Sequence, residues 1–191
     1  MVNNAGVGKH GLLAYSTVPI QGVGNSMLDT TEAEWDHIVN VDAKAVFFTM
    51  QKVIPVMVQQ GRGGRIINVG SAAWKYHPFP STSDGAYAAA KASVIVMSKT
   101  ASVQFARHNI NVNVVTPGTT RTAQWDLGLK EQSKRTGIPF DDLVKRGEAR
   151  IPVGRMNEPE DVAYMVVFLA GSKALNITGQ EFTVDGGLTM H

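Results

Sequence analysis

The sequence contains no cysteine and no long apolar run, and each absence excludes a class of protein. Without cysteine, disulfide bonds and thiol chemistry are impossible. No segment approaches the roughly 20 apolar residues that a membrane helix needs. Residues 1–6 lack the charged and apolar regions of a secretory signal. We therefore expect a cytoplasmic protein that does not enter a membrane.

Charge is also sparse, which limits the partners. Charged residues make up 18% of the 191 residues and the net charge is +2, so nucleic acid is not expected as a partner. The five histidines and the carboxylates show no ligand spacing, so no metal site is expected. Hydrophobic residues make up 43%, which is enough for a buried core.

Short apolar runs between turn residues predict strands around Val2 and at residues 65–69, 111–115 and 180–184. Segments with helical periodicity lie between them. Because strands alternate with helices, the sequence predicts an α/β fold with a mainly parallel sheet. No repeat or linker divides the chain, so residues 1–191 are expected to form a single domain.

Capping signals mark where the helices begin. Thr31 and Glu34 form a capping-box pattern, which starts a helix that runs to about residue 60. Pro55 is expected to bend or interrupt this helix. Asp84 and Asn157 are expected to cap two further helices. The apolar positions of the first helix are Trp35, Ile38, Val39, Val46 and Phe47.

Three distinctive segments directly follow predicted strands, namely Asn3–Gly6, Gly70–Ser71 and Pro117–Gly118. In an open parallel sheet, ligands bind beyond the carboxyl ends of the strands. Parallel strands bring these three segments to one edge, and Tyr87 begins a helix soon after the second of them. The sequence therefore predicts a ligand site at this edge.

Tyr87 and Lys91 stand four residues apart on this helix, so they share a face. A tyrosine titrates near roughly pH 10, and a nearby ammonium favours its phenolate. A tyrosine tuned in this way can exchange a proton near neutral pH. The three alanines between the two residues leave room for a flat cofactor. Taken alone, this spacing is more often an ordinary pair on a helix surface.

Together with the other segments, the pair resembles the short-chain dehydrogenase/reductase family. The resemblance covers essentially the whole chain and keeps the family's order of motifs. It is carried by Asn3–Gly6, Trp35 with Asn40 and Val41, Ile66–Ser71, Tyr87 with Lys91, Pro117–Gly118 with Thr122, and Val184–Gly187. It implies a Rossmann-like doubly wound parallel sheet and an enzyme that interconverts an alcohol and a ketone by hydride transfer.

The resemblance also implies a role for each residue. Tyr87 is implied to be the general acid/base, and Lys91 to hold the nicotinamide ribose and lower the pKa of Tyr87. Ser71 is implied to donate a hydrogen bond to the substrate oxygen. Asn40 is implied to hold a water in the proton relay to Lys91.

The implied cofactor is NAD or NADP. Residues on its adenosine side are expected to be Asn4, Ala5 and Gly6. Residues flanking its nicotinamide and diphosphate are expected to be Pro117, Gly118, Thr120 and Thr122.

Plainer roles stay open for several of these residues. Ser71 could cap a turn, and Asn40 could be a buried helix asparagine. Thr122 could be a loop hydroxyl, and Asn4 could stabilise the turn after its strand. Because the spacing from Ser71 to the catalytic tyrosine is longer than the family's, Ser81 and Ser83 are less favoured substitutes for Ser71.

The family's glycine-rich cofactor turn has no counterpart in this sequence. Residue 1 falls inside what would be the family's fourth strand, so we expect an N-terminally truncated fold that comprises the C-terminal catalytic part. The residue that selects NAD or NADP lies in the missing part, so either cofactor fits. The alternatives are a catalytically inactive fragment or a nonenzymatic binding protein on the same scaffold.

The substrate is expected to be a small alcohol or carbonyl compound. Trp74, His77 and Phe79 are candidates to line its pocket. Residues 119–150 are expected to form a long mobile loop with short helical pieces that closes over it. The apolar residues of that segment could line the pocket or pack on the core; they are Trp125, Leu127, Leu129, Ile138 and Phe140. Family resemblance implies a homotetramer or dimer that uses helices 29–60 and 84–108 and the last strand.

Overall fold

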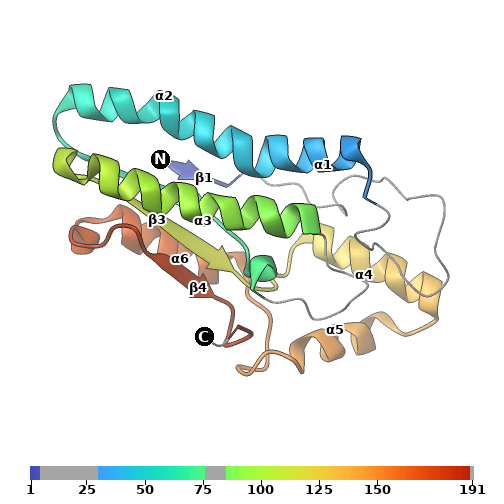
Figure 1. The fold of residues 1–191 in the computed structure, drawn as a ribbon. Helices are drawn as coiled ribbons and strands as arrows, with labels where there is room; N and C mark the ends of the chain where they lie inside the picture. Colours follow the sequence, from blue (N-terminus) through green and yellow to red (C-terminus); the bar gives the residue numbers. More distant parts are fainter. Residues whose placement is uncertain (5–29, 76–84, 190–191) are drawn as a thin grey trace.

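The computed structural model describes residues 1–4, 30–75 and 85–189. Its centre is a four-stranded parallel sheet in the order β1-β2-β3-β4, which follows the chain (Figure 1). The strands are β1 (Val2–Asn3), β2 (Gly64–Val69), β3 (Ile110–Pro117) and β4 (Glu181–Val184). All four predicted strands are confirmed, with boundaries shifted by one or two residues.

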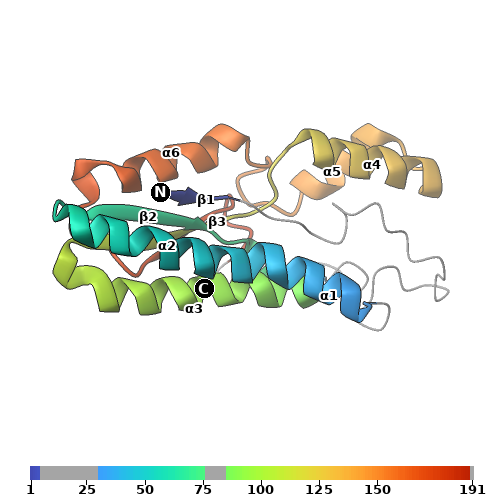
Figure 2. The same cartoon turned by 90° about the horizontal axis from the view of Figure 1, so that it is seen from above.

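Helices cover both faces of this sheet, as Figure 2 shows from above. On one face lie α1 (Glu32–Val39), a π-helical turn (Asn40–Lys44), α2 (Ala45–Gln60) and α3 (Gly85–Phe105). The other face carries α6 (Pro159–Ala170), while α4 (Ala123–Thr136) and α5 (Phe140–Glu148) lie beyond the carboxyl ends of the strands. A parallel sheet with helices on both faces confirms the predicted α/β, Rossmann-like fold class.

Alternate residues of β2 and β3 supply two cores. Strands covered on both faces are expected to be nearly continuous apolar runs, and β3 is buried along almost its whole length. The core under α2 and α3 contains Val46, Met50, Ile54, Ile66, Val94, Ala101, Ile110 and Val112. The core under α6 contains Ile67, Val115, Leu169 and Ala174.

The first helical region begins as predicted but continues differently. Thr31 accepts a hydrogen bond from the backbone N–H of Glu34, whose carboxylate accepts one from the Thr31 N–H, which confirms the capping box. An interruption at Pro55 does not occur, because α2 runs through that residue, and the alternative of a bend there stays a prediction. The irregularity lies instead in the π-helical turn at Asn40–Lys44.

This turn also corrects the predicted apolar face. Trp35 and Phe47 were expected on it, but they are 44% and 46% exposed. The buried stripe instead follows a spacing of four, through Ile38, Asp42, Val46, Met50 and Ile54. A straight α-helix repeats every 3.6 residues, so a stripe spaced by four drifts around it, and the π-helical turn takes up part of this drift.

Two further expectations change near the C-terminus. The cap of α6 is Glu158 and not Asn157, because the Asn157 side chain is buried and donates to the carbonyl of Val184. Residues 119–150 contain two regular helices, so they are more ordered than a long loop with short helical pieces.

The predicted cap Asp84 lies outside the described residues. Among the described helices, none is long and apolar enough to cross a membrane.

The start of α6 generates a prediction about acid stability. Arg155 donates two hydrogen bonds to the Asp161 carboxylate, at 2.6 and 2.9 Å, and the Glu158 N–H donates a third at 2.8 Å. These bonds, led by those from Arg155, lower the Asp161 pKa from 3.8 to about 2. Because the folded pKa lies below the unfolded one, this contribution to stability is complete above the unfolded pKa and is lost as the pH falls through about 2.

We therefore expect Asp161→Asn to lower the melting temperature by a few degrees near neutral pH. The difference from the unchanged protein should shrink as the pH approaches about 2. Glu160→Gln, one residue away in the same first turn, is the control and should have a smaller effect. Equal losses for both variants at neutral pH would contradict the assignment of Asp161 as the residue that holds this helix end.

Candidate active site

The parallel register brings the predicted loops to one edge of the sheet. Asn4 follows β1, Gly70 and Ser71 follow β2, and Pro117 ends β3. Asn4 is exposed at this edge. Ala5 and Gly6, which were predicted to contact the cofactor, lie outside the described residues. The predicted convergence therefore holds for every segment that the structure describes.

Tyr87 and Lys91 lie on one face of α3, as their spacing predicts. The Lys91 ammonium nitrogen is 5.7 Å from the centre of the Tyr87 ring. Tyr87 is half-buried, whereas Lys91 is only 3% exposed. This distance lies within the range of a cation–π contact between the ammonium and the ring. The proton-transfer role expected of the pair stays a prediction.

Lys91 has two described polar partners. Its ammonium nitrogen lies 3.0 Å from Oδ1 of Asp42 and 3.3 Å from the carbonyl oxygen of Val69, to which it donates. The side chains of Lys91 and Asp42 are 4% and 0% exposed. A charge removed from water at such depth is costly unless an opposite charge compensates it. Asp42 supplies the opposite charge, so the ammonium is held close to the Tyr87 ring.

Small side chains bring Asp42 to this position. Ala43 of the π-helical turn packs with Ala86 and Ala90 of α3, and Ile38 completes the cluster. Because Ala43, Ala86 and Ala90 are small, little side-chain bulk separates the two helical segments near Asp42 and Lys91. Ala90, one of the three alanines expected to leave room for a cofactor, therefore serves helix packing.

Asn40 takes part in the π-helical turn through its backbone. Its carbonyl accepts from the N–H of Ala45, five residues on, and its side chain is exposed. Among the described residues, no side-chain contact joins Asn40 to Lys91. The expected water relay through Asn40 stays a prediction, and the direct partner of Lys91 is Asp42, which sequence reasoning missed. An acidic residue within a buried stripe spaced by four was the signal that could have revealed it.

Ser71 caps the short 3-10 helix Ala72–Trp74, as its plainer role predicted. Its Oγ accepts a hydrogen bond of 3.2 Å from the N–H of Ala73. A hydroxyl has one hydrogen to donate and two lone pairs. The cap uses one lone pair, so the Ser71 hydrogen can still be donated to a substrate oxygen. The turn lies against α3, the helix that carries Tyr87.

The loop after β3 is fixed by close backbone contacts. A Cβ added to Gly118 would lie 2.5 Å from Cβ of Asp185, so this position requires glycine. The Thr120 hydroxyl donates to the carbonyl of Gly118 at 3.1 Å. Thr122 caps α4 by accepting from the N–H of Trp125 at 3.2 Å, a structural role that differs from the loop hydroxyl left open for it. Contact of Pro117, Gly118, Thr120 and Thr122 with a cofactor stays a prediction.

The chemistry of this edge fits the nicotinamide-ribose end of NAD or NADP. An ammonium has three donors, and Lys91 donates one hydrogen bond to Val69 while Asp42 pairs with its charge, so donor capacity remains for a ribose hydroxyl. Tyr87 and Ser71 add two hydroxyls at the same carboxyl edge. The ribose would be held by Lys91 and Tyr87, and the cofactor would supply the hydride.

Other expected site residues are placed differently. The Trp74 indole donates to Glu181 on β4 and so does not point freely into a pocket. Leu127 is 65% exposed, while Trp125 is half-buried between α4 and α5. His77, Phe79, Ser81 and Ser83 lie outside the described residues. Within residues 1–4, 30–75 and 85–189, no cluster of histidine and carboxylate side chains could hold a metal ion.

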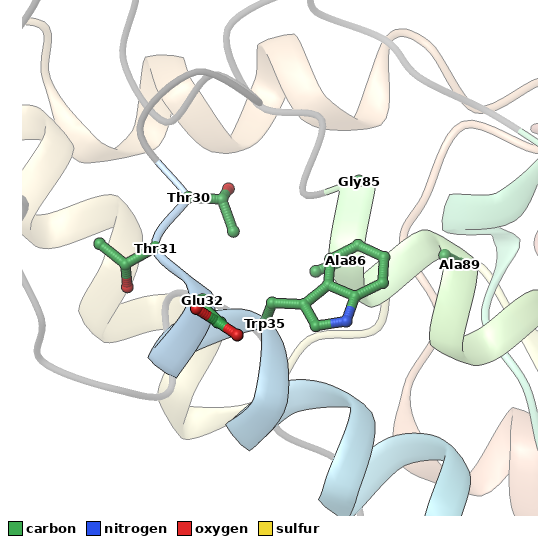
Figure 3. A pocket seen from close by; sticks show the side chains of 7 residues that line it. All are labelled: Thr30, Thr31, Glu32, Trp35, Gly85, Ala86 and Ala89. Atoms are coloured by element: carbon green, nitrogen blue, oxygen red, sulfur yellow. The ribbon is translucent and has the colours of Figure 1, made fainter.

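A cavity of about 460 Å³ opens between the starts of α1 and α3 (Figure 3). Its described lining contains none of the predicted catalytic residues. The lining residues are Thr30, Thr31, Glu32, Trp35, Gly85, Ala86 and Ala89.

Comparison with known proteins agrees with this geometry. Residues 1–189 match the family described as enoyl-(acyl carrier protein) reductase. The chain is 36% identical over 190 residues to a 3-oxoacyl-[acyl-carrier-protein] reductase, FabG, of Thermotoga maritima, and covers 100% of itself and 65% of that protein.

Two solved structures are also similar. An oxidoreductase of the short-chain dehydrogenase/reductase family from Burkholderia thailandensis superposes with a TM-score of 0.74 at 28% identity, over 98% of this chain and 63% of that one. A variant of actinorhodin polyketide ketoreductase solved with NADPH gives a TM-score of 0.82 at 28% identity, over 100% of this chain and 67% of that one. The chain thus spans about two thirds of the length of these relatives. Its fold, its motifs and these matches make it a member of the short-chain dehydrogenase/reductase family.

Proposed function

We propose that this chain is the catalytic part of an NAD(P)-dependent oxidoreductase that interconverts a ketone and an alcohol. The observation that carries the proposal is the buried Lys91 ammonium, held by Asp42 and Val69 and placed 5.7 Å from the Tyr87 ring. A charge fixed in this way beside a phenol is the arrangement that a general acid/base requires.

Each polar group at this edge has one task in the proposed reaction. When a ketone is reduced, the Tyr87 hydroxyl gives its proton to the carbonyl oxygen, and in the reverse direction its phenolate takes the alcohol proton. The Ser71 hydroxyl donates a hydrogen bond to the same oxygen and orients it. Lys91 stabilises the phenolate that remains. The cofactor supplies or receives the hydride when bound.

The relatives suggest which substrate to test first. One relative is named for reducing a 3-oxoacyl group and another as a polyketide ketoreductase, and both names denote a ketone on an acyl chain. We therefore propose a 3-oxoacyl thioester as the first substrate. NADPH is the first cofactor to test because the ketoreductase was solved with it, and NAD remains the alternative.

Self-association is proposed through the outer faces of α2 and α3. These faces expose several large apolar side chains, and exposed apolar clusters often mark protein contacts. They are Phe47, Phe48, Val56, Val96 and Val103. The predicted homotetramer or dimer would cover them.

Replacing Tyr87 with phenylalanine tests the proton-transfer role. We expect Tyr87→Phe to lower turnover of a 3-oxoacyl thioester by about 10²–10⁴-fold, the usual contribution of a general acid/base. Binding of NADPH, measured by its fluorescence, should change little because the ring remains. Tyr164→Phe is the matched control, since Tyr164 is 72% exposed on α6, and it should leave turnover unchanged. Unchanged turnover in Tyr87→Phe would rule out the assignment.

Removing the carboxylate beside Lys91 tests how the ammonium is held. We expect Asp42→Asn to lower the free energy of unfolding by about 3–5 kcal/mol, because a buried ammonium then lacks its counter-charge. Asp36→Asn, on the exposed side of α1, should change it by less than about 0.5 kcal/mol. Urea unfolding measures both.

A second variant separates the charge from the packing. In the double variant Asp42→Asn with Lys91→Met, no charge is left buried, so much of the lost stability should return. If the double variant is as unstable as the sum of its single changes, the two residues do not act as an ion pair.

A further inference from the structure

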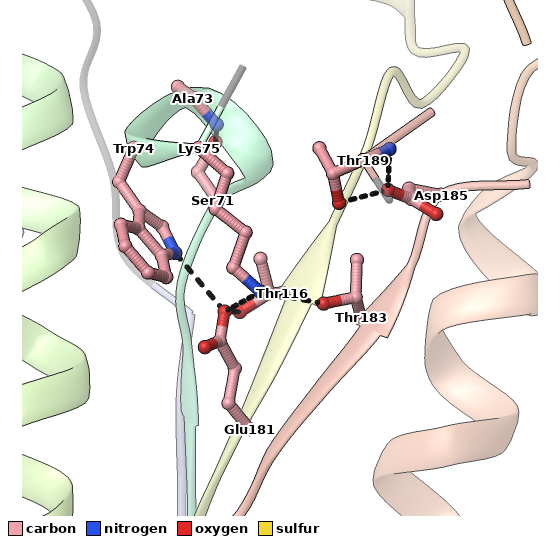
Figure 4. Close-up of polar contacts among 9 residues, drawn as sticks. All are labelled: Ser71, Ala73, Trp74, Lys75, Thr116, Glu181, Thr183, Asp185 and Thr189. Atoms are coloured by element: carbon pink, nitrogen blue, oxygen red, sulfur yellow. Dashed lines mark hydrogen bonds and ion pairs between the residues drawn. The ribbon is translucent and has the colours of Figure 1, made fainter. Parts of the chain in front are cut away.

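A single carboxylate oxygen on β4 joins this strand to the turn after β2 and to β3. Oε1 of Glu181, on β4, accepts from the Trp74 indole N–H at 3.1 Å and from the Thr116 hydroxyl at 2.9 Å (Figure 4). It also lies 3.1 Å from the ammonium nitrogen of Lys75. Trp74 and Lys75 belong to the turn after β2, and Thr116 lies near the end of β3. We call Trp74, Lys75, Thr116 and Glu181 the Glu181 cluster.

Lys75 strengthens the cluster through two more contacts. Its ammonium donates to the Thr183 hydroxyl at 3.3 Å and lies 5.0 Å above the Trp74 ring. The side chains of Lys75 and Glu181 are only 11% and 12% exposed. Ion pairs that water screens poorly are stronger than those on an open surface. Burial raises the pKa of Glu181, but hydrogen bonds from Thr116, Lys75 and Trp74 outweigh it and hold that pKa below its usual value.

The cluster holds the turn that begins at Ser71. Ser71 caps the 3-10 helix Ala72–Trp74, and the Lys75 N–H closes the turn on the carbonyl of Ala72 at 2.9 Å. One isolated helical turn is not stable by itself. Trp74 and Lys75 at its end are anchored on β4, while the Ser71 hydroxyl at its start accepts from Ala73. The orientation of that hydroxyl thus depends on a contact made at the other end of the turn.

The Glu181 carboxylate also contacts β3 near its end, through Thr116. Thr116 directly precedes Pro117 and Gly118, and a Cβ added to Gly70 would lie 2.9 Å from Oγ1 of Thr116. The ends of β2 and β3 are therefore in close contact, and Glu181 fixes both.

We propose that Glu181 is a positioning residue that, through Trp74 and Lys75, fixes the Ser71 hydroxyl for hydrogen bonding to the substrate oxygen. This inference rests on the proposed function, in which Ser71 binds that oxygen. A misplacement of about 1 Å in such a group can cost on the order of 10²-fold in rate.

The first test needs no turnover. In Glu181→Ala, hydrogen exchange of the Ala73 amide should become at least about 10-fold faster, because its bond to Ser71 loses support. The NMR signal of the Trp74 indole N–H should shift, while those of Trp35 and Trp125 stay in place. Glu181→Gln keeps an acceptor and should restore part of the protection. Glu160→Gln, on exposed α6 surface, is the control. Unchanged Ala73 exchange in Glu181→Ala would overturn the proposal.

The second test asks whether the effect passes through Ser71. Glu181→Ala should lower kcat by about 10–10²-fold with little change in NADPH binding. In a Ser71→Ala background the same change should add little, because the group being positioned is already gone. Fully additive losses would overturn the positioning role. The exchange result stands even if Tyr87→Phe shows the proposed reaction to be wrong, so the two failures can be told apart.

Discussion

The rest of this site depends on how the positive charge of the buried Lys91 ammonium is neutralised. Lys91 lies at the meeting point of α3, the end of β2 and the π-helical turn, and its partners come from all three. At 3% exposure the Lys91 ammonium loses most of its hydration. This loss costs free energy that an ion pair with a nearby carboxylate offsets. The Asp42 carboxylate and the Val69 carbonyl therefore do more than stabilise the fold. They fix a positive charge 5.7 Å from the centre of the Tyr87 ring.

Because the strands are parallel and in register, the residues that follow them lie along one edge of the sheet. Because Val2, Ile67 and their neighbours align in register, the loops that leave successive strands are adjacent. The two lysines at this edge are neutralised in different ways. Lys91 is fully buried against Asp42 on a neighbouring helix, whereas Lys75 is paired across the sheet with Glu181. The first holds a charge beside Tyr87, the residue proposed to transfer the proton, and the second joins the turn after β2 to β4.

Much of this was predictable because it follows from short-range patterns. The four strands, the capping box at Thr31 and the shared face of Tyr87 and Lys91 all follow from periodicity and spacing over a few residues. The partners of the two lysines were not predictable in the same way. Asp42 and Glu181 are far from Lys91 and Lys75 in the sequence, and only the packed structure brings each pair together.

The first helical region shows what a pattern of apolar residues alone misses. Trp35 and Phe47 are apolar yet 44% and 46% exposed, whereas the buried stripe, spaced by four residues through the π-helical turn, includes the charged Asp42. A π-helical turn is an irregularity that costs hydrogen-bond geometry, and it persists where packing requires it. Here Ala43, Ala86 and Ala90 provide that packing.

Ser71 shows that a structural role and a chemical role need not exclude each other. The sequence left open whether this residue caps a turn or binds a substrate oxygen, and the cap is present. An accepted hydrogen bond from Ala73 restricts the rotation of the hydroxyl and leaves its hydrogen as the remaining donor. A donor whose direction is set before the substrate arrives loses less entropy when it binds, and it stabilises developing charge without rearrangement. The cap is therefore the physical means by which a serine on a short turn can become a precise donor.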